Sequence, residues 1–339
     1  MNKTTSKRKI LTLIMVVLVL IGLVGLLYYL SKTGKIKPWA AGTGATLSLS
    51  PSSGTFEVGS SLNVDIVLNT NSRAVDDVDI FYLNYDPQIL QVQDADAGTP
   101  GTQIRPGTIF PTYTGNNVDT VNGKISLSGL IMGGSYNGTG IFATVNFKVI
   151  KNATTSAVTF NFTPGATNDT NVVEYGTFTD ILETVVNGAY NLIPPLSTIN
   201  ITLKLQGRSN HTTAGTNLKI YPTGQATPIL DKADVATNTN GNYSFTYRLP
   251  AGNYDFRLKA PNYLSRLLTS RAQSNPLNLD FGTLKAGDFD NNNLVNGLDF
   301  ARMNAIWFGT DAIMDLNQDS IINGIDFSIL NTNWFVQGE

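Results

Sequence analysis

The chain has 339 residues, a net charge of −2, 14% charged residues and no cysteine. This length is enough for two or three domains. The charge balance gives no basis for nucleic-acid binding, and the lack of cysteine excludes disulfides and thiolate metal sites. His211 is the single histidine, which excludes a histidine-clustered metal site. Abundant Gly, Thr, Asn and Ser between short strand-like segments indicates a mainly β protein.

The N-terminal segment has the pattern of a membrane anchor. Basic residues in positions 1–9 precede an uncharged stretch, residues 10–30. As a helix this stretch is about 30 Å long, the thickness of the hydrocarbon core. We therefore predict a cytoplasmic tail (1–9), a transmembrane signal-anchor helix (10–30), a linker (31–45) and a single-pass protein with its C-terminal bulk outside the cell membrane. The alternative is a cleaved signal peptide and a secreted protein.

Two β units follow, over residues 46–193 and 198–285, with "PPLS" as a stiff boundary between them. Apolar residues alternate in "SLNVDIVLN" and again in "INITLKLQG", which is typical of strands with one buried face. In the second unit, "NYSFTYRLPAGNYDFRLK" predicts a hairpin that turns at Pro250–Gly252. Each unit is long enough to bury a core of its own.

Residues 286–339 contain a duplication: "GDFDNNNLVNGLDFARMNAIWF" is repeated 27 positions later as "MDLNQDSIINGIDFSILNTNWF". Each copy fits a twelve-residue calcium loop, in which alternate residues supply hard oxygen ligands and position 12 closes the coordination sphere. This pattern predicts two Ca²⁺ ions; the alternative is a pair of Asx-rich turns that bind nothing. The predicted ligands are Asp288, Asp290, Asn292, Leu294 (carbonyl), Asn296 and Asp299 in loop 1, and Asp315, Asn317, Asp319, Ile321 (carbonyl), Asn323 and Asp326 in loop 2.

Position 6 of each loop is Asn293 or Ser320 instead of the usual Gly, at a place where a left-handed backbone is required. Loop 2 is therefore expected to be the weaker site. Behind the loops, Phe300, Met303 and Trp307, and likewise Phe327, Leu330 and Trp334, have helical spacing. We expect the two helices to pack on each other through these residues and to depend on the metal for stability.

These residues resemble a dockerin, a calcium-dependent module that binds cohesins. The shared pattern is "D-x-[DN]-x-[DN]-x-x-[VI]-N-x-x-D" followed by "F-x-x-[ML]-N-x-x-WF". The resemblance implies that positions 10, 11, 17 and 18 of each repeat contact the partner, in either of two orientations. Those positions are Gly297, Leu298, Asn304, Ala305, Gly324, Ile325, Asn331 and Thr332. Gly followed by an aliphatic residue indicates an apolar contact patch.

Residues 46–193 resemble a cohesin through "YDPQILQV" and through the Gly-rich turn that leads into "GIFATVNFKV". The resemblance implies a jelly-roll β-sandwich with one sheet face that receives a dockerin. If Phe81, Leu83 and Tyr85 point inward, the partner contacts are Ile80, Tyr82 and Asn84. Residues 198–285 resemble a carboxypeptidase-regulatory or Cna-B-like sandwich, which we interpret as a spacer.

The resemblances imply a membrane-anchored, extracellular, non-catalytic adaptor linked to polysaccharide-binding or polysaccharide-degrading assemblies. Its partners would be dockerin-bearing and cohesin-bearing proteins, among them other copies of itself. The alternative is a carbohydrate-binding surface protein that uses exposed rings such as Tyr113 and Tyr136. No enzyme is expected, because no pair of carboxylates stands outside the calcium loops and acidic turns in a pattern that glycoside hydrolysis needs.

Overall fold

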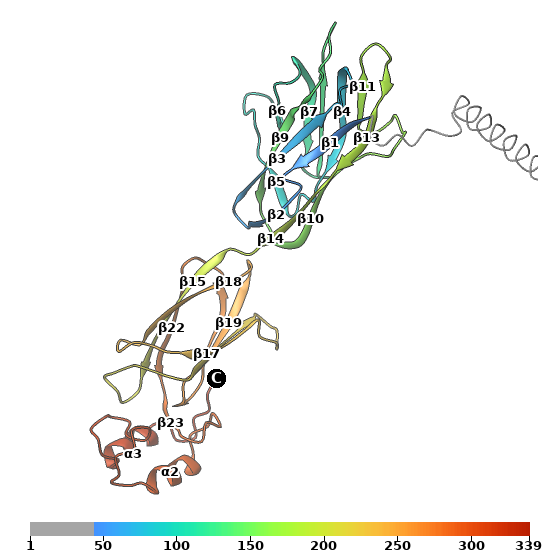
Figure 1. Cartoon of the computed structure of the whole chain (residues 1–339). Coiled ribbons are helices and arrows are strands. Elements are labelled where there is room, and N and C mark those ends of the chain that lie inside the picture. The colour runs from blue at the N-terminus through green and yellow to red at the C-terminus, as the bar shows by residue number, and fades with distance from the viewer. Residues whose placement is uncertain (1–43) are drawn as a thin grey trace, which may run out of the picture.

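The structure is a computed structural model that describes residues 44–339. The predicted cytoplasmic tail, transmembrane helix and nearly all of the linker lie outside the described residues. Within residues 44–339, no helix is long and apolar enough to cross a membrane. Figure 1 shows two β-sandwiches placed end to end, with two short helices at the far end of the second sandwich.

The first sandwich consists of two sheets. In one, the strands have the order β13-β1-β3-β9-β5, with β6 beside β9. In the other, the strands have the order β12-β11-β4-β10-β14-β2. Strand β8 also pairs with β4, and β7 pairs with β8. The first sheet contains β1 (Ala45–Ser50), β3 (Ser61–Asn69), β5 (Leu90–Val92), β6 (Arg105–Pro106), β9 (Thr139–Val149) and β13 (Leu182–Val186). The second contains β2 (Ser53–Glu57), β4 (Val75–Asn84), β7 (Thr112–Asp119), β8 (Lys124–Leu130), β10 (Ala153–Phe160), β11 (Asn171–Glu174), β12 (Thr179–Asp180) and β14 (Gly188–Ile193).

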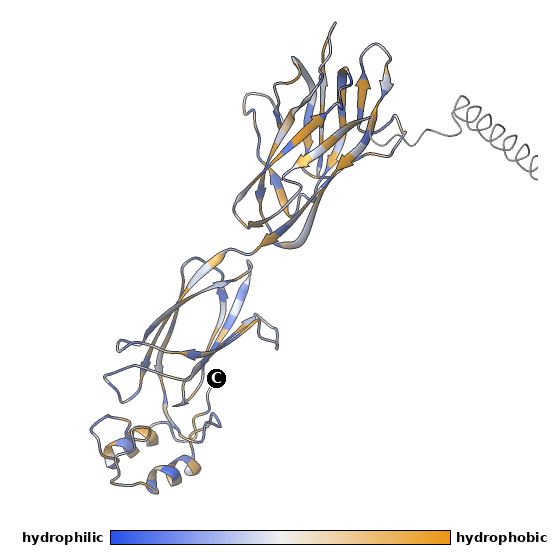
Figure 2. Cartoon of the chain, in the orientation of Figure 1, coloured by the Kyte–Doolittle hydropathy of each residue, from blue (hydrophilic) through white to orange (hydrophobic). Residues whose placement is uncertain are grey.

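The core of this sandwich follows the alternation in the sequence. The apolar residues of β3 are fully buried, namely Leu62, Val64, Ile66 and Leu68. They lie beside buried residues of β9 in the same sheet and form one continuous cluster with buried residues of β4 in the opposite sheet. Apolar and polar residues alternate along the strands in Figure 2, as expected when one face of a sheet is buried. The prediction of a β-sandwich in this part of the chain is thus confirmed.

The second sandwich has a three-stranded and a four-stranded sheet, with a two-stranded ribbon at one end. The strands of the first sheet are β18 (Asn242–Arg248), β15 (Leu196–Leu205) and β22 (Leu277–Leu284). Those of the second are β17 (Leu230–Val235), β16 (Thr216–Pro222), β19 (Asn253–Lys259) and β21 (Arg266–Ala272), and the ribbon pairs β20 (Asn262–Tyr263) with β23 (Ala286–Asp288).

The hairpin predicted across Pro250–Gly252 is wrong. Strand β18 pairs with β15, whereas β19 pairs with β16 and β21 in the opposite sheet. The connection crosses from sheet to sheet because Leu249, just before the turn, is fully buried. Alternating apolar residues on both strands do face the core, but from opposite sides of it.

The helical segment is not separate from the second sandwich. Helices α2 (Gly297–Asn304) and α3 (Gly324–Asn331) place Met303 and Leu330 in the same buried cluster as residues of β15, β19 and β22. The side-chain amide of Asn333 is also buried, where it donates to Ala286 O and Gln206 Oε1, both at 2.7 Å. Residues 286–339 therefore share one core with the sandwich that was interpreted as a spacer.

The junction between the two sandwiches is short. Strand β14 ends at Ile193 and β15 begins at Leu196, so that Pro194 and Pro195 alone connect them. One ion pair spans the junction, from Arg248 Nη1 to Glu57 Oε1 at 2.6 Å. The stiff boundary predicted from "PPLS" lies at this position.

Candidate calcium loops and docking surfaces

The two loops have the same backbone shape. Positive φ angles occur at Asn291 (58°) and Asn293 (68°) in loop 1, and at Gln318 (63°) and Ser320 (75°) in loop 2. These are positions 4 and 6 of both loops. The left-handed backbone expected at position 6 is therefore confirmed, and Asn adopts this conformation more readily than Ser.

The repeats also hold each other in a reciprocal way. The amide of Phe308, which follows α2, donates to Ile322 O of loop 2 at 2.9 Å. The amide of Phe335, which follows α3, donates to Val295 O of loop 1 at 2.8 Å. The Phe300 and Phe327 rings pack against each other, with 5.0 Å between centroids. The predicted packing of the two helices is confirmed, although Trp307 and Trp334 lie beyond the helix ends and are half-buried.

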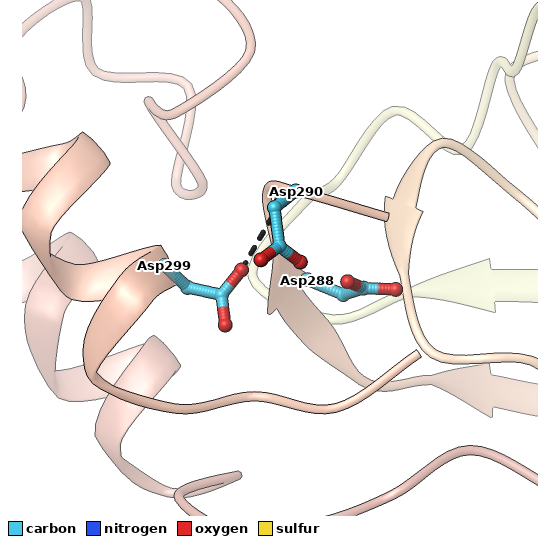
Figure 3. A group of neighbouring side chains, drawn as sticks. All are labelled: Asp288, Asp290 and Asp299. Carbon is cyan, nitrogen blue, oxygen red and sulfur yellow. Dashed lines mark hydrogen bonds between the residues drawn. The ribbon is translucent and has the colours of Figure 1, made fainter. Parts of the chain in front are cut away.

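In loop 1, three carboxylates converge. One oxygen from each of Asp288, Asp290 and Asp299 lies within 4.8 Å of the other two. Figure 3 shows Asp299 reaching from the start of α2 toward the two loop aspartates. Asp299 Oδ1 accepts from the amide of Asp290 at 3.2 Å, and its Oδ2 accepts from the amide of Asn296 at 2.8 Å. Burial raises the pKa of Asp299, and the neighbouring charge of Asp290 adds to this effect.

Asp288 provides the strongest test of whether this loop fits a cation. Its side chain is fully buried. The Oδ2 atom accepts from Lys259 Nζ at 2.5 Å and from the amide of Asn293 at 3.1 Å, whereas Oδ1 is buried and has no hydrogen-bond partner. A buried carboxylate oxygen without a partner is costly. Hard oxygen donors of this kind are what Ca²⁺ takes as ligands, so the residues fit the ion.

Loop 2 repeats the contacts of loop 1 in outline. Asp315 Oδ2 accepts from the amide of Ser320 at 2.7 Å, and Asp326 Oδ2 accepts from the amide of Asn323 at 2.9 Å. Across residues 44–339, however, the only trio of acidic groups close enough to share a cation is the one in loop 1. Loop 2 has Asn317 at position 3, where loop 1 has Asp290, so that the three carboxylates occupy different positions in the two loops. That loop 2 is the weaker site stays a prediction.

Position 9 has a role in the helix that sequence analysis did not assign. Asn296 Oδ1 accepts from the amide of Leu298, and Asn323 Oδ1 from that of Ile325, both at 2.7 Å. Each asparagine is thus the N-cap of its helix, with Asp299 or Asp326 completing a capping box. The signal was present in the sequence as Asn followed three residues later by Asp. Coordination of calcium by these side chains stays a prediction.

The predicted helix contacts are accessible. All eight residues at positions 10, 11, 17 and 18 of the repeats are exposed, with Leu298 at 62% and Ile325 at 55%. A Cβ atom at Gly297 or Gly324 would meet no atom within 4 Å, so the space above both glycines is open. Phe308 and Phe335 are also exposed, at 71% and 74%. Large apolar side chains are therefore exposed at the start of each helix and just beyond its end, whereas Asn304, Asn331 and Thr332 are exposed polar residues of the same predicted contact set.

The contacts predicted on β4 require correction. Ile80 is 1% exposed and cannot contact a partner, whereas Phe81, expected to point inward, is 46% exposed. The reason is an irregularity between Ile80 and Leu83 in the pairing of β4 with β8, which shifts the alternation of side chains. Tyr82 and Asn84 are half-buried. No pattern in this single sequence identified the bulge.

The outward face of β4 therefore combines aromatic and acidic groups. The rings of Phe81 and Tyr82 lie 4.4 Å apart, and Lys124 Nζ is 4.6 Å from the centre of the Tyr82 ring. Nearby on the same strand, burial and the charges of Asp79 and Asp76 raise the pKa of Asp77 to about 6.

The rings proposed for sugar stacking are placed elsewhere. Tyr113 and Tyr136 are half-buried and pack against Phe110, with ring centroids 6.3 and 6.2 Å away. Both belong to the edge of the first core. Neither ring is exposed as expected, because each packs against the first core.

Comparison with known families decides the class of the first sandwich. Residues 45–189 match the cohesin domain. The match covers the whole of the first sandwich except the last strand's end, and it confirms the resemblance seen in the sequence. It does not extend to the second sandwich or to the helical segment, whose likeness to other families stays a prediction.

Solved structures of cohesins are similar to part of this chain. The solution structure of CaCohA2 from Clostridium acetobutylicum is 21% identical, with 44% of this chain and 90% of that chain covered and a TM-score of 0.34. The third ScaC cohesin of Acetivibrio cellulolyticus, in complex with the ScaB dockerin, is 22% identical, with 44% and 98% covered and a TM-score of 0.35. The Coh-OlpC-Doc435 complex from Clostridium thermocellum is 14% identical, with 46% and 98% covered and a TM-score of 0.35. No curated protein matches the chain.

Proposed function

We propose that this chain is a non-catalytic adaptor that uses two protein-binding surfaces, one on the cohesin-like sandwich and one on the calcium-loop helices. The first would receive a dockerin-bearing protein, and the second would dock on a cohesin-bearing protein once two Ca²⁺ ions are bound. The observation that carries the proposal is the cohesin match of residues 45–189 in the same chain as the duplicated loops.

Calcium binding by the loops is supported by the buried, unpartnered Oδ1 of Asp288 and by the convergence of Asp290 and Asp299 on it. In loop 1, Asp288, Asp290 and Asp299 would hold the ion, and in loop 2 Asp315, Asp319 and Asp326 would do so. Bound calcium would neutralise these carboxylates and fix the start of each helix. Leu298 and Ile325 would then be exposed on ordered helix starts.

The docking surface of the first sandwich is supported by the side chains on the outward face of β4. Phe81 offers exposed apolar area, and Lys124 and Asp79 offer charges of both signs beside it. Aromatic residues in such positions often dominate the binding energy of protein interfaces. We infer that Phe81, Tyr82 and Asn84 contact the partner, and that Ile80 supports them from the core.

Pairing between different copies is favoured over pairing within one chain. Figure 1 places α2 and α3 at the end of the second sandwich that points away from the first. The two prolines at the junction and the shared core leave no flexible linker that would bring the helices back. Membrane anchoring through residues 10–30, exposure at the cell surface and a link to polysaccharide are further parts of this proposal.

Sedimentation analysis of the chain over a range of concentrations tests the proposal. With calcium we expect larger species that grow with concentration and disappear in EDTA. Gly297→Trp combined with Gly324→Trp should suppress them, because both residues lie under open space on exposed helix starts. Phe81→Ala should also reduce the amount of these larger species, because it alters the proposed docking surface of the first sandwich. A monomer at every concentration in calcium would contradict pairing between copies.

A further inference from the structure

The two loops differ in one respect that the duplication conceals: loop 1 is tied to the second sandwich. Lys259, the last residue of β19, places Nζ 2.5 Å from Asp288 Oδ2 and 2.5 Å from Tyr263 O. The same ammonium group reaches Asn291 Oδ1 at 3.3 Å. A lysine of the sandwich thus neutralises the buried carboxylate at position 1 of loop 1.

Two asparagines add further ties between loop 1 and the ribbon segment after β19. Asn291 Oδ1 accepts from the amide of Asn262 at 3.0 Å. Asn293 Oδ1 accepts from the amide of Ser265 at 2.8 Å, and its Nδ2 donates to Ser265 Oγ at 2.9 Å. Asn291 and Asn293 are the two residues with left-handed backbone in this loop. The two positions of loop 1 with an unfavourable left-handed backbone are therefore held by hydrogen bonds to residues of the second sandwich.

Loop 2 has no equivalent ties within the described part of the chain. Asp315 accepts hydrogen bonds from the amides of Asp319 and Ser320, at 3.2 and 2.7 Å, and no ion pair of residues 44–339 includes it. Gln318 and Ser320, which take the places of the two asparagines, are exposed. Asp315, at position 1 of loop 2, is thus buried with hydrogen bonds from backbone amides but without a cationic partner, so that burial of its charge is costly without an added cation.

We propose that Lys259 is a positioning residue that holds loop 1 in its binding shape before calcium arrives, so that calcium orders loop 2 much more than loop 1. The inference rests on the calcium sites proposed above. The ammonium group does not take the place of the ion, because it binds Oδ2 of Asp288 and leaves Oδ1 without a partner. Lys259 would act on the ion only through Asp288.

Hydrogen exchange of the full chain, followed by mass spectrometry in EDTA and in calcium, tests the inference. In EDTA we expect residues 287–296 to exchange more slowly than residues 314–323. Lys259→Met removes a charge-assisted hydrogen bond and should speed exchange in the first segment roughly 10- to 100-fold, with no change in the second. Calcium should restore protection to the variant, which a general loss of structure would not allow.

Two further variants make the result specific. Lys204→Met removes the same charge from an exposed position of the same sandwich and should change neither loop. Asn291→Ala removes the hydrogen bonds that Asn291 Oδ1 accepts from Lys259 and Asn262 and leaves the buried ion pair, so it should act in the same direction as Lys259→Met but more weakly.

Three outcomes would overturn the inference: equal exchange of the two loops in EDTA, no effect of Lys259→Met on loop 1, or loss of protection throughout β15 and β16 in that variant. The last would assign Lys259 to the stability of the whole sandwich. Failure of the calcium sites themselves would look different, because calcium would then protect neither loop of the unmodified chain.

Discussion

The two halves of this molecule are built on different plans. The first sandwich closes a core of its own, and every buried apolar residue of that cluster lies between Ala45 and Leu192. The second sandwich shares its core with the helices, so that Ile199 of β15 and Leu330 of α3 belong to one cluster. A boundary drawn between residues 285 and 286 would therefore cut through a continuous core. The comparison shows that a sequence duplication need not mark a separate folding unit.

The largest effect that separates the two halves should come from their cores. Leu330→Ala removes a fully buried side chain from the shared core and should cost about 2–5 kcal/mol. Calorimetric unfolding should show the loss in one transition that includes both the second sandwich and the helices.

Leu68→Ala is the matched control, because this leucine is equally buried in the first core. It should lower the stability of the first sandwich by a similar amount and leave the transition of the second sandwich and helices unchanged. If Leu330→Ala unfolded the helices while the second sandwich kept its transition, the shared core would not be a cooperative unit.

The pH dependence of the first sandwich should come next in size. Because burial raises the pKa of Asp77 to about 6 in the folded state, the folded protein holds this proton more tightly than the unfolded chain does. The resulting stability is complete below pH 4 and is lost as the pH rises through 6. Asp77→Asn should therefore flatten the fall in Tm between pH 4 and pH 7 for the first transition alone.

Asp96→Asn should change the pH dependence of stability in the opposite direction. A hydrogen bond from Thr99 lowers the pKa of Asp96, so this exposed residue favours the folded state at neutral pH rather than in acid. Melting curves of both variants at four or five pH values would check the assignment. A Tm profile unchanged by Asp77→Asn would show that its carboxylate is not the group responsible.

The smallest effect should be found at the junction. Arg248 and Glu57 are partly exposed, with 39% and 44% of their side-chain surface accessible. Arg248→Met should change the stability of either half by about 0–1 kcal/mol. A larger shift, seen in both transitions at once, would mean that the two halves unfold together as one cooperative unit.

Much of this architecture can be predicted from short segments of the sequence. Alternation in β3 and β15 identifies their buried faces because one side of each strand faces a core. The shape of the two duplicated loops can also be predicted from the sequence, since the spacing of their Asp and Asn residues and their left-handed positions follow from twelve consecutive residues. What the sequence does not show depends on residues far apart along the chain.

Three features illustrate this limit. The bulge after Ile80 depends on how β4 meets β8. The separation of β18 from β19 depends on where Leu249 is buried. The contact of Lys259 with Asp288 joins two elements that look unrelated in sequence. In each case local propensity leaves the outcome open and tertiary packing decides it.

Scanning calorimetry of the full chain in calcium and in EDTA tests the central claim most directly. Calcium at about 100 times its dissociation constant stabilises a folded state by roughly 2.7 kcal/mol for each site. The transition of the second sandwich and helices should therefore rise by several degrees in calcium, as one unit, while that of the first sandwich stays in place. If neither transition moved, or if the helices melted apart from the second sandwich, the claim of one calcium-dependent unit with a shared core would be contradicted.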